Sequence, residues 1–430
     1  MKVQHESRPA RVLILNCVVQ NGGDAAILYA VLGQVRRAFG DDTEITAFDM
    51  NPAEANRLYS KVGTFLSEPF SSNPGRTGVR RRASLAGMVM STLVRSSPLG
   101  GIINRVLPAR NGSVQALLDA DAIVATGGTY LVDHYDLKQR IFSFFLARLT
   151  GKPTYLFTQS MGPFQKKYIR RYLPIALRNV KHVFLRDERS LGYLRNIMPR
   201  VSATVCHDVV FDLAHPSKRE TASPPVVLVS VREWSRFGDR SEDEGRELYF
   251  SSIANAVTKL IRERGVRVRF VSTCQGLESY RFDDSAVASQ ILDRIPEDCR
   301  SVAEVDSDFH RPDELVDLLS TASFVISTRM HMAILSMNHE LPVFAVAYEF
   351  KTEELFANLG IGECHVDIAK ITPDKFSGDV MEAFDRRDEI QSTLRKVLPA
   401  VRRSAATPLD ALRETASKLG FRPNHHEMNE

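Results

Sequence analysis

Short β-branched runs alternate with helical patterns along almost the whole chain, and this alternation limits the fold more than any other feature. In the first half the runs that predict strands are Arg11–Asn16, Glu44–Phe48, Ala122–Ala125, Thr154–Thr158, His182–Leu185 and Ala203–Cys206. The helical patterns between them are Ala25–Phe39, Leu137–Leu149, Lys167–Arg178 and Ser190–Ile197. Alternating strands and helices are typical of a parallel, doubly wound sheet. The first half therefore predicts a Rossmann-like domain.

A second series of the same kind follows the polar segment His215–Pro225, whose composition is that of a linker. Its predicted strands are Val226–Val231, Val266–Ser272, Phe324–Ser327 and Pro342–Ala347. Its predicted helices are Glu244–Arg264, Arg281–Leu292, Pro312–Ser320 and Met330–Met337. We therefore expect an α/β protein with two Rossmann-like domains, residues 1–214 and 226–370, that face each other across a cleft. Residues 371–430 are expected to form helices that pack back on the first domain, and a tail.

The composition argues against several classes of protein. With 43% hydrophobic and 25% charged residues, the chain resembles a soluble globular protein. No apolar run reaches the roughly 18–20 residues of a membrane span, and the polar N-terminus does not predict a signal peptide. Five scattered cysteines without a CxxC pair favour reduced thiols over disulfides or a zinc site. The net charge of +4 is too small to indicate nucleic-acid binding. We expect a cytoplasmic protein.

The stretch Ser327-Thr-Arg-Met-His331 joins a predicted buried strand to a predicted helix. In an open parallel sheet, ligands lie outside the carboxyl ends of the strands, beside helix N-termini that favour anions. The next strand brings Tyr348 and Lys351 to the same edge. Arg329, Lys351 and the titratable imidazole of His331 therefore predict an anion site with a proton-transfer group. The alternative, a structural histidine, is the commoner role of a lone histidine.

Arg232 ends the first strand of the second half and is followed by Trp234, the only tryptophan. An arginine at the carboxyl end of a strand suits a bidentate contact with a carboxylate or phosphate. An ordinary surface arginine is the alternative. The unperturbed pKa of histidine, about 6.5, would let His331 donate a proton at cellular pH.

Three turns of the first half are rich in hydroxyl and amide groups, which suit a neutral, hydroxylated ligand. Their candidate ligand-binding residues are Asn21, Asp24, Thr129, Tyr130, Asp133, Gln159 and Ser160. The turn at Asn21-Gly-Gly-Asp24 lacks the GxGxxG spacing of a dinucleotide site. All three could instead be tight turns, with Asp24 as a helix cap. Arg186-Asp187 predicts an internal ion pair, with Ser190 near a helix cap.

The segment 69–118 contains no Asp or Glu, and it holds several arginines interleaved with apolar clusters. These arginines are Arg76, Arg80, Arg81, Arg82, Arg95, Arg105 and Arg110. A basic, amphipathic segment of this kind indicates contact with anionic lipid at the inner face of a membrane. A mobile loop at the cleft or a dimer contact is the alternative.

Taken together, these motifs resemble the polysaccharide pyruvyl transferase family. The resemblance runs through Asn21-Gly-Gly-Asp24, Gly127-Gly-Thr-Tyr130, Thr158-Gln-Ser-Met-Gly-Pro163, Arg186-Asp-Glu-Arg-Ser190, Asp208, Arg232, Ser327-Thr-Arg-Met-His331 and Tyr348-Glu-Phe-Lys351. It covers roughly residues 10 to 360. The chain departs from the family at Asp208-Val209, where Asp-Pro is common. The resemblance implies a fold like that of GT-B glycosyltransferases and the transfer of an enolpyruvyl group from phosphoenolpyruvate to two hydroxyls of a sugar, giving a pyruvate ketal.

By this resemblance, Arg232, Arg329 and His331 fall on positions that bind phosphoenolpyruvate, joined by Lys351 and Ser327. The turns of the first half would bind the saccharide acceptor, a polysaccharide unit or its lipid-linked precursor. Our hypothesis makes His331 the general acid and has the cations hold the donor. The chemistry requires no metal and no cofactor, because phosphoenolpyruvate is a co-substrate. The alternative is a GT-B glycosyltransferase that uses a nucleotide sugar, with Glu349 or Glu353 binding the ribose. A non-catalytic sugar- or lipid-binding protein is disfavoured, because it has no need of this set of cations.

Overall fold

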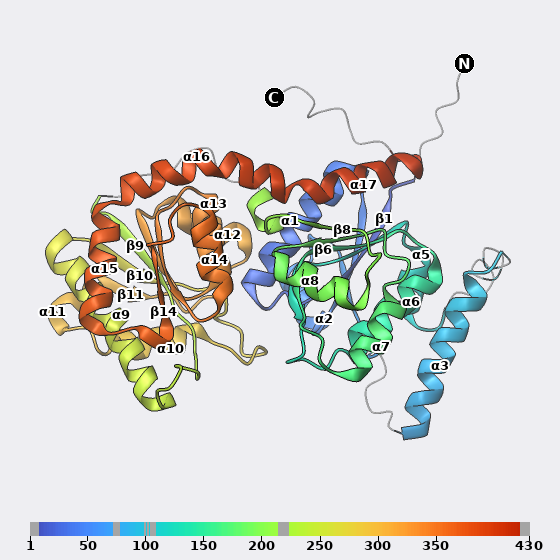
Figure 1. The fold of residues 1–430 in the computed structure, drawn as a ribbon, viewed down its shortest axis with the longest axis horizontal. Coiled ribbons are helices and arrows are strands. Elements are labelled where there is room, and N and C mark those ends of the chain that lie inside the picture. Colours follow the sequence, from blue (N-terminus) through green and yellow to red (C-terminus); the bar gives the residue numbers. More distant parts are fainter. Residues whose placement is uncertain are drawn as a thin grey trace, which may run out of the picture. The chain divides into compact units, whose positions relative to one another are not determined.

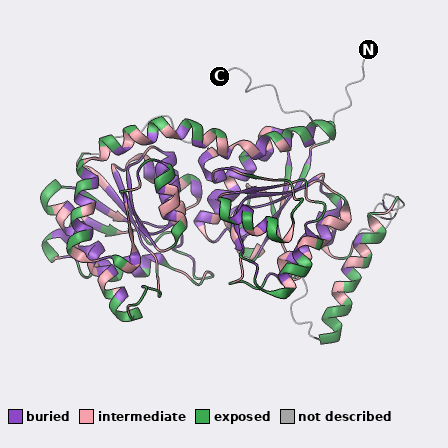
Figure 2. Ribbon diagram, in the orientation of Figure 1, coloured by how far each residue is buried: buried purple, intermediate pink, exposed green. Residues whose placement is uncertain are grey.

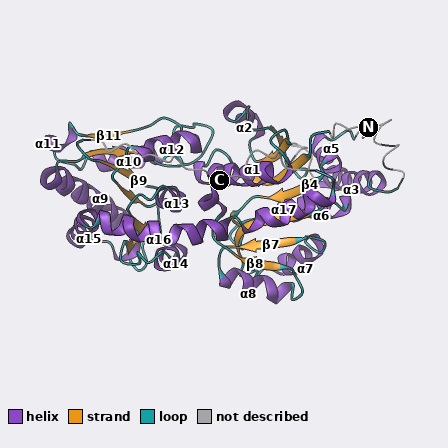
Figure 3. Ribbon diagram, turned by 90° about the horizontal axis from the view of Figure 1, so that it is seen from above, coloured by secondary structure: helices purple, strands orange, loops and turns teal. Residues whose placement is uncertain are grey.

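The computed structural model describes residues 8–71, 78–98, 100, 103, 109–213 and 223–421. The chain divides into two compact units, and each is described by itself. Unit 1 contains the described parts of Met1–Val19, Ile27–Asp212 and Ser404–Glu430, and unit 2 those of Gln20–Ala26 and Leu213–Arg403. Figure 3 shows that both units combine a sheet with covering helices.

Unit 1 is built on a parallel sheet of eight strands in the order β3-β2-β1-β4-β6-β7-β8, with β5 paired to β6 (Figure 1). The strands are β1 (Arg11–Cys17), β2 (Glu44–Asp49), β3 (Thr64–Ser67), β4 (Ala122–Ala125), β5 (Gly128–Leu131), β6 (Thr154–Met161), β7 (His182–Leu185) and β8 (Ala203–Val205). The order reverses between β1 and β4, so the carboxyl ends of these two strands mark the expected ligand site of this unit.

Most helices of unit 1 lie between its strands in sequence, whereas η1 and α17 follow its last strand. They are α1 (Gly22–Phe39), α2 (Pro52–Leu58), α3 (Gly78–Arg95), α5 (Gly112–Asp119), α6 (Lys138–Thr150), α7 (Lys167–Ala176), α8 (Glu188–Ile197), the 3-10 turn η1 (Val209–Asp212) and α17 (Thr407–Lys418). The first residues of α1 are grouped with unit 2. The central strands are buried, as the purple ribbon of Figure 2 shows, and their hydrophobic residues form the core.

Unit 2 has a six-stranded parallel sheet in the order β11-β10-β9-β12-β13-β14. The strands are β9 (Val226–Ser230), β10 (Arg267–Phe270), β11 (Ala303–Val305), β12 (Phe324–Ser327), β13 (Val343–Ala347) and β14 (His365–Asp367). The order is that of a Rossmann fold, with its reversal between β9 and β12. Both sheets are parallel, as the sequence predicts.

Helices cover both faces of this second sheet (Figure 1). They are α9 (Glu242–Arg264), α10 (Asp284–Leu292), α11 (Glu297–Arg300), α12 (Pro312–Ser320), α13 (Met330–Asn338), α14 (Phe350–Asn358), the 3-10 turn η2 (Ile368–Lys370), α15 (Pro373–Asp385) and α16 (Arg387–Ala405). The sequence sets the ends of α9 clearly. Ser241 accepts a hydrogen bond from the backbone N–H of Glu244 at 3.3 Å, and Gly265 closes the helix with a φ of 63°.

The division into units differs from the predicted domains in two places. Gln20–Ala26 is grouped with unit 2, and so are α15 and most of α16, whereas only residues from Ser404 onward return to unit 1. α15 packs on α9, which explains its place. Most of the predicted linker, residues 215–222, lies outside the described residues, as does the predicted tail. Four short strands that the sequence did not reveal, β3, β5, β11 and β14, have three or four residues each.

The basic, acid-free segment forms α3 and α5, while Arg76 and Arg105 lie outside the described part of the chain. α3 packs against α5 and α6 through a face that contains buried Met88 and Thr92. None of the helices that the structure describes is both long enough and apolar enough to cross a membrane.

Candidate functional site

The carboxyl ends of β9 and β12 meet at the strand-order reversal of unit 2. β9 leads to Arg232, and β12 leads through Thr328 and Arg329 into α13, whose first turn contains His331. Thr328 donates its backbone N–H to the carbonyl of Ser230 at 2.7 Å, which ties the two strand ends together. Arg232, Arg329 and His331 therefore follow the carboxyl ends of two neighbouring strands, at the edge of the sheet where the sequence predicts them.

Arg329 is held in a buried ion pair. Its Nε and Nη2 donate to the two carboxylate oxygens of Asp284 at 2.8 and 2.6 Å, and the two side chains are only 10% and 2% exposed. Asp284 also accepts from Ser272 Oγ at 2.7 Å. Sequence analysis missed Asp284, which starts α10 and lies 45 positions from Arg329 in the chain. The bidentate pair fixes the guanidinium plane and neutralises most of its charge.

Burial and charge act together on the groups around this pair. Burial would lower the pKa of Arg329, but the charge and the hydrogen bonds of the Asp284 carboxylate help to raise it overall, so the guanidinium stays charged. Burial raises the pKa of the Cys274 thiol to about 11, so Cys274 remains a neutral thiol near pH 7. The Nη1 nitrogen of Arg329 takes no part in the pair with Asp284, which uses Nε and Nη2.

Arg232 is held by stacking. Its guanidinium carbon lies 4.3 Å from the ring centre of Tyr348 and 5.0 Å from that of Trp234. No acidic side chain in the part of the chain that the structure describes lies within ion-pair distance of Arg232. Tyr249 supports this end of β9, because its hydroxyl accepts from the Arg232 backbone N–H at 3.4 Å and hydrogen-bonds Thr328 at 2.7 Å. Arg232 therefore carries an uncompensated positive charge on an ordered side chain.

His331 packs against the first turn of α1. A Cβ atom on Gly23 would lie 2.7 Å from His331 Nδ1, closer than real contacts allow, so this approach requires glycine. The neighbouring Gly22 donates its backbone N–H to the Thr273 carbonyl at 2.6 Å. Asn21 caps this turn by accepting from the Gly23 N–H at 2.9 Å, and Asp24 lies in the same turn. The sequence placed Asn21 and Asp24 with the acceptor turns, but they lie beside His331.

The remaining two donor-site candidates have different surroundings. Ser327 is buried, and its hydroxyl donates to the Arg329 carbonyl at 2.8 Å, so it shapes the start of α13. Lys351 lies in the first turn of α14, after β13, with its Nζ 3.9 Å from Glu349. β13 neighbours β12 in the sheet, so both residues belong to the same edge.

In unit 1, the predicted acceptor residues Tyr130 and Gln159 are joined in one buried cluster. The Tyr130 hydroxyl accepts from Gln159 Nε2 at 2.9 Å and from Asn16 Nδ2 at 3.2 Å, and it donates to the Thr126 carbonyl at 3.1 Å. Burial raises the pKa of Tyr130, so the phenol stays protonated. These turns are strongly interconnected, and they lie at the carboxyl ends of β1, β4 and β6.

The expected ion pair between Arg186 and Asp187 is wrong. Arg186 Nη1 donates to Asp208 at 2.5 Å, and its other nitrogens donate to Thr129 at 2.8 Å and Ser160 at 3.3 Å. Asp187 instead caps α8, as its carboxylate accepts from the Ser190 N–H at 2.7 Å and from Ser160 Oγ at 2.7 Å. The predicted position of Ser190 near the cap is correct.

Asp133 also has a structural contact. Its carboxylate accepts from the backbone N–H groups of Gln165 and Lys166 at 2.9 and 3.2 Å, immediately before α7. A carboxylate in this position stabilises the start of a helix. Asp133 therefore fixes the end of the turn that follows β6.

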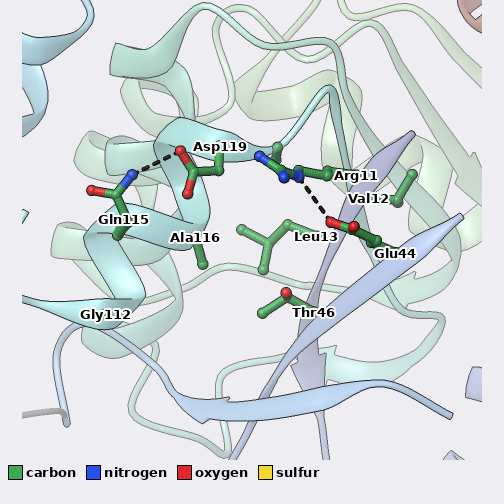
Figure 4. A pocket seen from close by; sticks show the side chains of 10 residues that line it. Arg11, Val12, Leu13, Glu44, Thr46, Gly112, Gln115, Ala116 and Asp119 are labelled. Atoms are coloured by element: carbon green, nitrogen blue, oxygen red, sulfur yellow. Dashed lines mark hydrogen bonds and ion pairs between the residues drawn. The ribbon is translucent and has the colours of Figure 1, made fainter. Parts of the chain in front are cut away.

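A pocket of about 340 Å³ lies at the opposite, amino edge of the unit 1 sheet (Figure 4). Its charged groups already pair with neighbours: Arg11 with Glu44 at 2.8 Å, and Asp119 with Gln115 at 2.7 Å. Such a pocket offers no uncompensated cation for an anionic ligand. Within the described ranges, no group of three or more His, Cys, Asp or Glu side chains is arranged to hold a metal ion.

Comparison with known proteins agrees with these motifs. The family described as polysaccharide pyruvyl transferase matches residues 21–349. The amylovoran biosynthesis protein AmsJ of Erwinia amylovora is 26% identical over 405 residues, which cover 90% of this chain and 95% of that protein.

Solved structures of low identity share the fold. UDP-GlcNAc 2-epimerase from Neisseria meningitidis, bound to UDP-GlcNAc, has a TM-score of 0.56 at 11% identity and covers 95% of this chain and 100% of its own. HepE from Anabaena, in complex with UDP-glucose, has a TM-score of 0.53 at 12% identity, with 95% and 99% coverage. The predicted GT-B-like class of two parallel-sheet α/β domains is confirmed.

Proposed function

Because this chain belongs to the polysaccharide pyruvyl transferase family, we propose that it transfers the enolpyruvyl group of phosphoenolpyruvate to two hydroxyls of a saccharide. The product is a pyruvate ketal, and inorganic phosphate is released. The observation that carries the proposal is the ordered, unpaired Arg232 beside the N-terminus of α13, with His331 in its first turn. This combination suits a small ligand with two anionic groups and a carbon that must be protonated.

The donor would be held by cations with distinct tasks. Arg232 binds one anionic group of phosphoenolpyruvate with its stacked guanidinium, and Lys351 assists from α14. Arg329 contributes the Nη1 that its pair with Asp284 leaves over, and Asp284 keeps that nitrogen oriented. The N-terminal N–H groups of α13 add further favourable potential for an anion.

His331 acts as the general acid in this proposal. It donates a proton to the methylene carbon of phosphoenolpyruvate. The neighbouring carbon, which bears the phosphate oxygen, then becomes an oxocarbenium-like centre. One sugar hydroxyl attacks this centre and loses its proton. The second hydroxyl then displaces phosphate, and His331 assists the departure of that leaving group. Two C–O bonds and one C–H bond form, while the carbon–carbon double bond becomes a single bond, and the C–O bond to phosphate and two hydroxyl O–H bonds break. One hydroxyl proton replaces the proton that His331 gave to the methylene carbon, and the other leaves on phosphate, so no oxidant or reductant is needed.

The acceptor would be a saccharide of a polysaccharide or of its lipid-linked precursor. Unit 1 supplies hydroxyl and amide groups for it, with Thr129, Tyr130, Gln159 and Ser160 on one connected network. Asp133 holds the turn between β6 and α7 by accepting from the Gln165 N–H. Asn21 and Asp24, whose turn lies beside His331, would orient the attacking hydroxyl. Many short hydrogen bonds of this kind recognise hydroxylated ligands.

The test is incubation with phosphoenolpyruvate and a panel of sugars, read by the mass of one added pyruvate and by released phosphate. We expect both signals only when donor and acceptor are present together. The His331→Ala variant should lose about 10²–10⁴-fold in turnover, the usual contribution of a general acid. Near-normal turnover of this variant at saturating phosphoenolpyruvate would show that His331 is not the acid.

The competing reaction is glycosyl transfer from a nucleotide sugar, which the same fold supports in other proteins. Thermal shift separates the two, because a bound donor raises the unfolding temperature. We expect stabilisation by phosphoenolpyruvate and none by a series of nucleotide sugars at equal concentration. Stabilisation by a nucleotide sugar alone would favour glycosyl transfer, with Glu349 or Glu353 as the group to mutate next.

We also propose that α3 places the enzyme on an anionic membrane, at the inner face where a lipid-linked acceptor would lie. The face of α3 opposite Met88 carries exposed apolar side chains at helical spacing: Val79, Ala83, Ala86, Met90, Leu93 and Val94. At 3.6 residues per turn, Arg80 and Arg82 flank this stripe on its two sides. An apolar stripe between arginines, on a helix without acids, suits the surface of anionic lipid.

Sedimentation with phosphatidylserine vesicles tests this surface. Met90→Glu combined with Leu93→Glu should abolish co-sedimentation, because charged groups would face the acyl chains. Met50→Glu is the matched control, since Met50 is 67% exposed and lies outside α3. Equal binding of both variants to vesicles would show that α3 is not the contact.

A further inference from the structure

Arg140 in unit 1 stacks on tyrosine rings and has no acidic partner among the described residues. It lies in the first turn of α6, half-exposed, with its guanidinium carbon 5.2 Å from the ring centre of Tyr130 and 5.9 Å from that of Tyr135. No acidic group among the residues described by the structure is within ion-pair distance of it. The buried acid Glu68 has an electrostatic interaction with Arg140, and its carboxylate accepts a hydrogen bond from Ser143 Oγ at 3.0 Å.

Unpartnered buried atoms gather around the same tyrosine. Arg140 Nε, Asn16 Oδ1 and Gln159 Oε1 are buried and have no hydrogen-bond partner in the described part of the chain. Gln159 is fully buried and Asn16 is 6% exposed, and both donate to the Tyr130 hydroxyl. Folded proteins leave few such atoms unsatisfied. One cationic donor and two carbonyl acceptors therefore converge on the ring and hydroxyl of Tyr130.

The cluster differs from the other arginine site of unit 1. Arg186 is 8% exposed and pairs with Asp208, so the carboxylate of Asp208 neutralises its charge. Arg140 retains its charge, and an arginine that stacks on an aromatic ring is pre-oriented for a carboxylate or phosphate. The two amide oxygens nearby can accept only from donors such as sugar hydroxyls. The complementary ligand carries an anionic group with hydroxyls next to it.

We propose that Arg140 binds an anionic group of the acceptor, while Asn16 and Gln159 accept hydrogen bonds from adjacent sugar hydroxyls. This inference rests on the proposed function, since it names the class of acceptor: an acidic saccharide unit. The anionic group is either the carboxylate of a uronic acid or the phosphate through which a sugar is linked to its lipid. Both present oxygens that a guanidinium binds in a bidentate manner.

Binding of three probes, measured by titration calorimetry without phosphoenolpyruvate, tests the inference. The probes are methyl glucuronide, methyl glucoside, and glucose linked through a diphosphate to a short prenyl chain. We expect wild type to bind at least one anionic probe more tightly than methyl glucoside. Arg140→Gln should weaken only that binding, by about 10- to 100-fold, the range of hydrogen bonds to a charged group. The anionic probe that loses affinity identifies the source of the charge.

Two further variants separate recognition from structure. Arg148→Gln changes a half-buried arginine in the last turn of the same helix, whose Nη1 donates to the Ile175 carbonyl at 3.0 Å, and should bind all probes like wild type. Arg140→Lys retains the positive charge but loses the planar guanidinium that binds an anion through two N–H groups, so it should keep part of the preference for the anionic probe. It also serves as the test variant if Arg140→Gln does not fold.

Some results would overturn the inference. These are no detectable binding of either anionic probe to wild type, equal binding of methyl glucuronide, methyl glucoside and the diphosphate probe, or an equal loss for all probes in Arg140→Gln. If the enzyme forms the ketal but binds the charged and uncharged probes equally, only the proposed role of Arg140 is wrong. If no ketal forms with any acceptor while charge-dependent binding remains, the proposed function falls and the anion site stands.

Discussion

The carboxyl edges of the two sheets each hold one ion-paired arginine and one stacked arginine. In unit 2 these are Arg329, paired with Asp284, and Arg232, stacked on Tyr348. In unit 1 they are Arg186, paired with Asp208, and Arg140, stacked on Tyr130. The paired arginines are each held by a buried carboxylate, whereas the stacked ones have no acidic partner among the described residues and are the main anion-binding groups of our proposals. Sequence alone does not distinguish the two kinds, because the difference is made by a distant acid.

The groups beside each stacked arginine differ between the edges. Arg232 has a helix N-terminus and the imidazole of His331 on its edge of the sheet, which suits a small anion that must be protonated. Arg140 has amide oxygens and a phenol nearby, which suit hydroxyls. The comparison therefore supports our two proposals, which are proton transfer in unit 2 and recognition of a hydroxylated, charged acceptor in unit 1.

The largest expected effect concerns the paired arginines. Asp284→Ala would leave Arg329 buried without its partner, and such a loss costs about 3–5 kcal/mol in unfolding free energy. Asp208→Ala should behave in the same way in unit 1. Arg232→Ala and Arg140→Ala should each cost below about 1 kcal/mol, the size of an exposed cation–π contact. Urea denaturation of the four variants measures this, and equal losses in all four would remove the distinction.

The second effect tests the assignment of proton transfer to unit 2. Gly23→Ala would push His331 away, since the new Cβ would lie 2.7 Å from Nδ1. A displacement of about 1 Å can lower turnover about 10²-fold. Gly33→Ala is the control on the same helix, because a Cβ there meets nothing within 4 Å. Steady-state turnover of both variants decides, and full activity of Gly23→Ala would show that His331 does not need its present position.

The fold was predictable because periodicity is a local property. Strands such as Phe324–Ser327 and helices such as Pro312–Ser320 agree with the prediction to the residue, since burial on both faces of a parallel strand leaves a continuous apolar run. The edge strands β3 and β14 were missed because three or four half-buried residues carry too little pattern. The position of Ser327 and Lys351 at one edge of the sheet was also predictable, because they lie at the ends of strands β12 and β13, which follow each other in sequence and pair in the sheet.

The pairing of charges was not predictable. Arg186 is adjacent to Asp187 in sequence, yet Asp187 is needed to cap α8 and Arg186 turns to Asp208. Asn21 and Asp24 follow a strand of unit 1, but their turn packs on Thr273 and His331. In both cases the partner is chosen by tertiary packing, which a single sequence does not encode locally.

A third, smaller effect tests the stacked arginine of unit 2. Arg232→Ala should raise the KM for phosphoenolpyruvate about 10- to 100-fold, as expected for lost hydrogen bonds to a charged group, and leave the KM for the acceptor unchanged. Arg236→Ala is the control, since that side chain is exposed nearby. Steady-state kinetics with each substrate varied separately gives both constants. An equal change in the two KM values would place Arg232 outside the donor site.

The smallest effect concerns the acid behind Arg140. Burial raises the pKa of Glu68, although Arg140 opposes the shift. A carboxyl whose pKa is raised by folding stabilises the protein fully below its ordinary value of 4.5 and loses that contribution as pH rises through the raised value. The Glu68→Gln variant does not lose stability in this way, because the amide of glutamine does not ionise. The unfolding free energy of Glu68→Gln should therefore increase relative to that of wild type as pH rises above about 4.5. Urea denaturation at a series of pH values measures the difference, and a gap that narrows with rising pH would mean that Glu68 is ionised and compensates Arg140 after all.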